Sequence, residues 1–279
     1  MLGSLLVAST LLPFVLAGEL WQPIQRSRFQ IVLNRPMKVD PQGNVSPDAT
    51  IFDIDLFDND PTTIATLKGQ GKKTICYFSA GTYEPYRPDS RQFQRNDMGA
   101  RLPEWRDEKW LDVNSQNVRK IMANRIQLAA DKGCDGVDPD NMDGYTYRRN
   151  GVSLRKADTV KYMRFLSTEA EKRGLSIGLK NALDIVEDVL PFTQFAVNEQ
   201  CAEYKECDAY QPFLDAGKPV FHIEYPKAAP RISGKDVQKA CEDRFTGSSM
   251  GNFSTVLKNW DLDGWAAFCD GSSAETAVL

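Results

Sequence analysis

The 279-residue sequence contains a single histidine, His222, and no pair of cysteines separated by two residues. A zinc centre is therefore not expected, because zinc sites take closely spaced cysteine and histidine ligands. No Gly-x-Gly-x-x-Gly motif follows an apolar segment, which argues against a dinucleotide-binding fold. A Ser-His-Asp hydrolase would need His222 itself, and a histidine inside an apolar segment is more often packed in a core. We expect neither a cofactor nor a metal.

Long runs of one charge are also missing. The chain has 34 lysines and arginines against 38 aspartates and glutamates, which gives a formal net charge of -4. Nucleic-acid-binding proteins usually carry a basic patch, so a nucleic-acid partner is not expected. A weakly acidic protein suits a neutral or cationic substrate.

Charged side chains are absent from the first 17 residues, where residues 5–16 form an apolar run too short to span a bilayer. Val15 and Ala17 stand three and one residues before the expected cleavage point, which predicts a secretory signal peptide over residues 1–17. An uncleaved anchor is the alternative. We expect residues 18–279 to form a secreted, extracellular monomer that has no contact with the membrane after cleavage.

Six cysteines in an exported chain predict disulfide bonds, although many pairings are possible. The short spacing of Cys201 and Cys207 favours that pair. The second preferred pair is Cys241–Cys269, which leaves Cys76 with Cys134. The alternative for Cys76, inside an apolar segment, is a free buried thiol.

Strand-like apolar segments alternate with segments of helical periodicity. We expect strands at 29–33, 51–58, 74–79, 136–139, 175–181, 195–199, 219–224 and 263–269. Helices are expected at 115–132 and 159–173, and a long polar loop at 82–114. Such alternation implies a parallel sheet, and eight units in one domain predict an α/β fold of the (β/α)8 or TIM barrel type. A doubly wound open sheet is the alternative.

Residues 133–143 carry four aspartates in nine positions, around the β-branched Val137. At the carboxyl end of a barrel strand these acids would lie where TIM barrels place their chemistry. One alternative is a turn rich in Asp and Gly. Another is a calcium or magnesium site formed by Asp138, Asp140 and Asp143.

Other expected strands also carry polar side chains near their ends. These residues are Asp53, Asp55, Tyr77, Asn181, Glu199 and Glu224. With one histidine in the chain, chemistry by carboxyl groups alone remains, and glycoside hydrolysis needs two carboxyl groups flanking the scissile bond. Asp140 and Glu199, from different strands, fit that requirement. The remaining strand-end residues, with Asp138, are candidates for binding substrate.

Aromatic residues in the expected loops could stack on sugar rings. Candidates are Trp21, Tyr83, Trp105 and Tyr145. Ordinary loop packing is an equally good interpretation of each one.

Residues 135–140, Asp-Gly-Val-Asp-Pro-Asp, resemble the Asp-Gly-x-Asp-x-Asp-x-Glu motif of family 18 chitinases. Met142 occupies the position of the terminal glutamate, so the proton donor of that family is missing and a working chitinase is not expected.

A broader resemblance is to glycoside hydrolase family 114, the endo-α-1,4-polygalactosaminidases. It rests on blocks in the same order along the chain: residues 21–23, 29–31, 52–55, 75–81, 136–141 and 198–201. The resemblance implies a barrel that cleaves α-1,4-linked galactosamine polymers internally. It implies a catalytic aspartate after the fourth strand and a glutamate after the sixth, which match Asp140 as nucleophile and Glu199 as acid/base, with Asp138 as the substitute for Asp140. A non-catalytic polysaccharide-binding barrel and an α-galactosidase-like hydrolase of another glycan are the alternatives.

Overall fold

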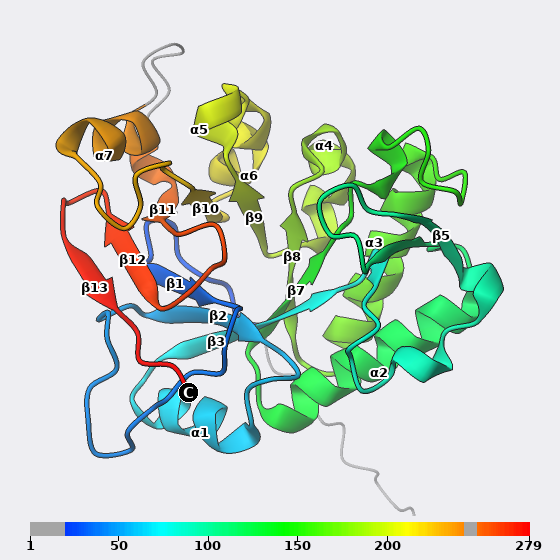
Figure 1. Ribbon diagram of the computed structural model, residues 1–279, viewed down its shortest axis with the longest axis horizontal. Helices are drawn as coiled ribbons and strands as arrows, with labels where there is room; N and C mark the ends of the chain where they lie inside the picture. Colours follow the sequence, from blue (N-terminus) through cyan, green and yellow to red (C-terminus); the bar gives the residue numbers. More distant parts are fainter. Residues whose placement is uncertain (1–19, 243–249) are drawn as a thin grey trace, which may run out of the picture.

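The structure is a computed structural model that describes residues 20–242 and 250–279 (Figure 1). The expected signal peptide, residues 1–17, lies outside the described residues. Within the described part of the chain, no helix has the length and apolar character needed to cross a bilayer.

Eight parallel strands form one strongly curved sheet in the order β1-β2-β3-β7-β8-β9-β10-β11. Their bounds are β1 Phe29–Val32, β2 Ile51–Asp55, β3 Lys73–Ser79, β7 Gly136–Asp140, β8 Ser176–Lys180, β9 Phe195–Glu199, β10 Val220–Glu224 and β11 Ser254–Leu257. The curvature brings β1 beside β11, where the buried Gln30 side chain accepts a hydrogen bond from Lys258 and donates one to the Gly264 carbonyl. The predicted single-domain TIM barrel is confirmed.

The eighth parallel strand is not the one expected. Residues 263–269 contain β12 (Trp265–Phe268), which runs antiparallel to β11 and pairs with β13 (Ser273–Glu275). The true eighth strand, β11, is only four residues long and begins at Ser254, so its sequence gives little periodicity to detect.

Helices pack around the outside of the sheet (Figure 1). They are α1 Pro61–Gly69, α2 Gln116–Lys132, α3 Lys156–Glu171, α4 Val186–Val189, α5 Cys201–Tyr204, α6 Gln211–Asp215 and α7 Gly234–Cys241. Helix α1 begins where the Asp60 carboxylate accepts the Thr63 amide, with proline in the first turn, and α2 ends at the left-handed Gly133. Both helix ends were readable from sequence.

Side chains on the inner face of the barrel form layers. The lower layer is apolar and includes Ile51, Ile75, Phe195 and Phe221. Gly178 makes room for this layer, since a Cβ there would lie 2.2 Å from the Phe195 ring. Side chains two residues apart along a strand share a face, so the next inward position lies two residues further along each strand. On β2, β3, β7 and β8 this position carries an ionisable or hydroxyl group instead of an apolar one. The polar layers therefore begin directly above the apolar one.

Residues 82–114, expected as a loop, contain a small antiparallel sheet of β4 (Thr82–Tyr83), β5 (Met98–Arg101) and β6 (Lys109–Leu111). Beneath it, Arg125 and Arg87 pair with buried Glu84, and Arg125 also holds Asp89. This ion-pair network fixes the segment against α2 at one side of the barrel mouth.

The three expected disulfides are all formed: Cys76–Cys134, Cys201–Cys207 and Cys241–Cys269. Cys76 is therefore not a free thiol. The first bond ties β3 to the start of the aspartate segment, and the second closes the turn that follows Glu199. Two of the three bonds thus anchor segments that carry acidic residues of interest.

Candidate active site

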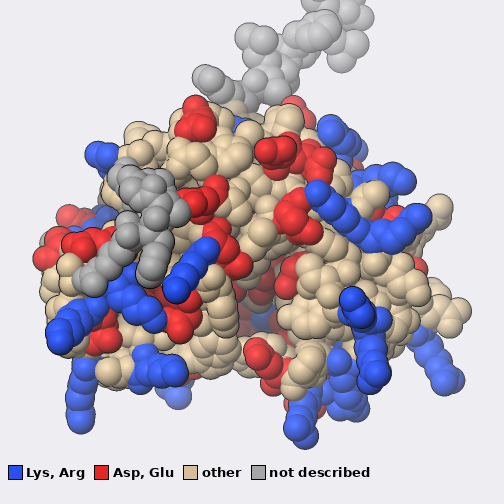
Figure 2. All heavy atoms as spheres, turned by 90° about the horizontal axis from the view of Figure 1, so that it is seen from above, with Lys and Arg blue, Asp and Glu red and all other residues tan. Residues whose placement is uncertain are grey.

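A cleft of about 850 Å³ opens at the carboxyl ends of the strands. Its walls include ten acidic residues: Asp55, Glu84, Glu104, Glu108, Asp140, Asp143, Asp184, Glu199, Glu206 and Asp261. The basic residues in the lining are Arg87 and Lys180. Seen from above, the molecule has a central hollow with acidic side chains gathered in and around it (Figure 2). The local field therefore favours a cationic ligand.

Asp140, the last residue of β7, reaches the cleft with its side chain 18% exposed. Its Oδ2 accepts a 2.7 Å hydrogen bond from the Tyr77 hydroxyl, and its Oδ1 accepts the Asn141 amide. Burial, followed by the charge of Asp140, raises the pKa of Tyr77 well above its usual value, so Tyr77 stays a donor. The segment after Asp140 passes so close to β3 that a Cβ on Gly81 would lie 1.8 Å from the Asn141 carbonyl oxygen.

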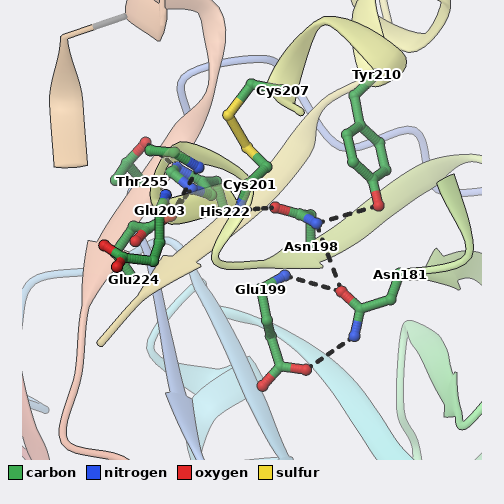
Figure 3. The surroundings of a disulfide bond; sticks show 11 residues. Asn181, Asn198, Glu199, Cys201, Glu203, Cys207, Tyr210, His222, Glu224 and Thr255 are labelled. Carbon is green, nitrogen blue, oxygen red and sulfur yellow. Dashed lines mark hydrogen bonds and ion pairs between the residues drawn. A yellow bond between two sulfur atoms is a disulfide. The ribbon is translucent and has the colours of Figure 1, made fainter. Parts of the chain in front are cut away.

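Glu199, the last residue of β9, lines the same cleft as Asp140. Asn181 donates its side-chain amide to Glu199 Oε2 at 2.9 Å and accepts the Glu199 backbone amide, also at 2.9 Å (Figure 3). The Tyr225 hydroxyl, just beyond β10, donates to Glu199 Oε1 at 2.5 Å. Both carboxylate oxygens of Glu199 are therefore held in place by hydrogen bonds.

Lys180, at the end of β8, lies between the two acids. Its Nζ is 3.4 Å from Asp140 Oδ1 and 3.5 Å from Glu199 Oε2. These two oxygens are therefore separated by no more than the sum of the two distances. The two carboxyl groups are therefore close neighbours, as the acids of a glycosidase must be.

Asp138 and Asp53 lie directly below Lys180, on the buried side. Both side chains are almost fully buried and, apart from each other and Lys180, none of their carboxyl oxygens has a hydrogen-bond partner. Burial, followed by the charge of Asp138, raises the pKa of Asp53 well above its usual value, which favours its protonated form as a donor to Asp138. Asp138 does not line the cleft, whereas Asp140 does.

Two other sequence candidates already have protein partners. Asp55 lines the cleft, but both of its oxygens accept hydrogen bonds from the Arg87 guanidinium, at 3.0 and 2.6 Å. Glu224 is outside the cleft lining and accepts a hydrogen bond from the Ala202 amide and another from His222, which lies beside it in Figure 3. His222 is fully buried, as the structural interpretation predicted.

Glu108 and Asp143 are among the other cleft acids whose pKa values are raised. Burial raises the pKa of Glu108 to about 7, although the Thr82 hydroxyl donates to it. Burial and then the charge of Asp140 raise the pKa of Asp143 to about 6. Both side chains line the cleft.

Of the four proposed sugar-stacking aromatics, only Trp105 lines the cleft. Trp21 packs against Phe195 at the opposite end of the barrel, and Tyr83 packs against Phe93. Tyr145 donates its hydroxyl to Asp184. Other exposed aromatic residues line the cleft, although the sequence argument did not select them. They are Tyr86, Tyr147, Tyr204 and Trp260.

Within residues 20–242 and 250–279, one group of three potential metal ligands comes close together: Cys201, Cys207 and His222. Its two sulfur atoms form a disulfide, so they offer no thiolate to a metal. The proposed metal ligands Asp138 and Asp140 instead have the Lys180 ammonium group beside them.

The residues of this site that sequence reasoning missed include Lys180 and Tyr225. The sequence did contain a signal for Lys180, which directly precedes Asn181 in the expected strand 175–181. A lysine in an apolar strand is buried only at a high energetic cost unless acidic groups surround it. Tyr225 lies one residue beyond β10, and its proximity to Glu199 becomes evident only when β9 and β10 are paired.

Known proteins with a similar sequence or structure include glycoside hydrolases. The model of glycoside-hydrolase family GH114 matches residues 15–274. A crystal structure of Aspergillus fumigatus Ega3 in complex with galactosamine is 48% identical, covers 89% of this chain and 97% of its own, and has a TM-score of 0.83. The glycoside hydrolase domain of PelA from Pseudomonas aeruginosa shares the fold at 12% identity, with coverage of 86% and 98% and a TM-score of 0.61. Comparison with curated proteins gives no match.

The family match spans nearly the whole chain, and Asp140 and Glu199 line one cleft at the carboxyl ends of the strands. The protein is a glycoside hydrolase and belongs to family GH114.

Proposed function

We propose that the protein is an endo-acting hydrolase of α-1,4-linked, galactosamine-rich polysaccharide, with Asp140 as nucleophile and Glu199 as acid/base. The main observation is a cleft whose lining carries ten acids against two bases and includes these two carboxyl groups. Galactosamine units without acetyl groups carry ammonium groups, which such a cleft attracts. Family membership and the galactosamine bound to the Ega3 relative support this substrate class.

The proposed reaction proceeds by two displacements with retention of configuration. The Glu199 carboxylic acid protonates the glycosidic oxygen while an Asp140 oxygen bonds to the anomeric carbon and the glycosidic bond breaks. Water then attacks the anomeric carbon, gives its proton to Glu199, and releases Asp140. The choice of Asp140 over Asp138 is supported by exposure, since Asp138 is completely buried beneath the cleft.

Tyr77, Asn181 and Tyr225 would orient these two acids, while Glu108 and Asp143 would bind amine or hydroxyl groups of the sugar. Asp53 and Asp138 would act from below, through Lys180. Asp55 and Glu224 would hold the walls of the cleft in place instead of touching the substrate directly.

We also propose that residues 1–17 are a cleaved signal peptide and that residues 18–279 act as an extracellular monomer. Three disulfide bonds support export, because such bonds persist in oxidising compartments. Mass spectrometry of the protein released by its host would give the mature N-terminus.

The activity is tested by incubating the protein with de-N-acetylated α-1,4-galactosamine polymer and detecting oligomers by mass spectrometry. Asp140→Asn and Glu199→Gln should each lower kcat by at least about 10³-fold, while the exposed Asp131→Asn on α2 should not. Binding without products would reject the proposal. Proton NMR of the first products gives the stereochemistry, and β-anomers would reject the double displacement.

A further inference from the structure

We propose that Lys180 is a positioning residue whose ammonium group is the shared counter-ion of Asp140 and Glu199, beside whichever of them carries the negative charge at each stage. This inference rests on the function proposed above. Lys180 does not act on the substrate in this proposal. It acts through the two acids that do.

The geometry places one cation within reach of both acids at once. The Lys180 Nζ lies 3.4 Å from Asp140 and 3.5 Å from Glu199, and its side chain is 2% exposed. Water therefore screens neither ion pair strongly, and the pairs are worth more than surface pairs would be. A movement of well under an ångström would favour one acid over the other.

Lys180 has charged or aromatic neighbours on several strands. They are Asp53 on β2, Tyr77 on β3, Asp138 and Asp140 on β7, and Glu199 on β9. Burial alone would lower the pKa of Lys180, but the charges of these acids outweigh it and raise that pKa well above its usual value. The lysine therefore stays charged throughout the working pH range.

The reaction moves negative charge from one acid to the other. Before the first step Asp140 is a carboxylate and Glu199 carries the proton. Once the bond from Asp140 to the anomeric carbon has formed, Asp140 is a neutral ester, and Glu199, which has given its proton to the departing oxygen, is the carboxylate. The second step reverses both changes, with water supplying the oxygen and the proton. Lys180 thus faces one negative charge in either state and needs no rearrangement, which is the condition for electrostatic preorganisation.

Asp138 and Asp53 hold the lysine from below. Asp138 Oδ2 is 3.9 Å from the Lys180 Nζ, and Asp53 lies beside Asp138 with no other partner for its carboxyl group. A buried charge of this kind is stabilised only while its partners stay in place. This arrangement explains the pair of deeply buried aspartates that the two-carboxylate mechanism does not itself use.

The test replaces Lys180 by methionine, which has an unbranched side chain and no charge. On de-N-acetylated polymer we expect kcat to fall by about 10²-fold. KM should stay the same or fall, because the cleft loses a positive charge while the substrate is cationic. The pH–kcat profile should move to higher pH, because removing a cation favours the protonated forms of the adjacent acids. A structural defect alone would not produce this combination.

Lys258→Met is the matched control, since Lys258 is another fully buried lysine but lies outside the cleft lining. It should leave kcat unchanged in the folded fraction. If Lys180→Met does not fold, the double variant Lys180→Met with Asp138→Asn also replaces the carboxyl group beneath the lysine by a neutral amide, and it should show the same loss of kcat.

Three results would overturn the inference: a folded variant that keeps kcat within about threefold of wild type, a loss confined to KM, or a failure of both variants to fold. If the wild type cleaves the polymer and Lys180→Met has the same kcat, only the role of Lys180 is rejected. Absence of cleavage by the wild type would reject the proposed function and this inference with it.

Discussion

Asn181 is joined to Glu199 twice: its side-chain amide donates to the Glu199 carboxylate, and its side-chain carbonyl accepts the Glu199 backbone amide, each at 2.9 Å. These two bonds lock both the position of β9's last residue and the direction of its side chain (Figure 3). Since Asn181 itself adopts a left-handed conformation with φ of 48°, the end of β8 is shaped to make this contact.

Asn181→Ala should therefore lower kcat by about 10- to 100-fold, because a misplaced acid/base loses the benefit of orientation. The KM should change far less. Steady-state kinetics on the galactosamine polymer measures both constants, and Asn114→Ala, at an exposed position outside the cleft, is the control. Unaltered kcat in a folded Asn181→Ala enzyme would contradict the assigned role of the hydrogen bonds.

The buried Asp53–Asp138 pair should make the protein less stable as pH rises. The unfolded chain releases these protons near pH 4, whereas the folded chain retains them, since burial raises the pKa of Asp53 well above its usual value and that of Asp138 to about 7. The native state therefore binds more protons, and each retained proton lowers the free energy of unfolding by about 1.4 kcal/mol per pH unit across this range.

Asp53→Asn removes one titrating group while keeping a donor for Asp138. Its free energy of unfolding, relative to wild type, should therefore rise as pH increases from about 4 towards 7. Urea denaturation at several pH values gives this difference. A constant difference across that range would show that Asp53 does not hold a proton in the folded protein.

Glu108 should make substrate binding depend on pH near neutrality. Because burial raises the pKa of Glu108 to about 7, its carboxyl group is largely protonated below that pH and ionised above it. The ionised form attracts an ammonium group, so the wild-type KM should fall as pH rises through about 7. In Glu108→Gln this fall should be weaker, while Glu187→Gln, an exposed change outside the cleft, should behave as wild type.

Glu224 should affect stability more than binding. It accepts hydrogen bonds from the Ala202 amide at 2.9 Å and from His222 at 2.9 Å, which pins the turn after Glu199 to β10. Glu224→Gln, which weakens charge-assisted bonds, should lower the free energy of unfolding by about 1–2 kcal/mol and leave KM within about twofold. Thermal unfolding and kinetics on the same sample separate the two effects, and a large rise in KM with normal stability would make Glu224 a substrate-binding residue after all.

Local sequence determined the strands, the long helices and the acids that end the strands. Alternation of apolar segments with helical periodicity fixed the barrel, because secondary structure of each type has its own spacing of buried residues. The same reasoning placed Asp140 and Glu199 at strand ends. It could not find β11, whose four residues carry too little pattern, nor the small sheet of β4, β5 and β6, whose strands are stabilised mainly by pairing with one another.

Tertiary structure alone decided which polar groups share an environment. The sequence treats Asp53, Asp55, Asp138 and Asp140 alike, but Asp55 is held by Arg87, Asp53 and Asp138 face each other below the cleft, and Asp140 reaches it. The position of Lys180 between Asp140 and Glu199 depends on the curvature and stagger of β7, β8 and β9. Electrostatic energies vary with distance and burial, and neither quantity exists until strands far apart in the chain are brought together.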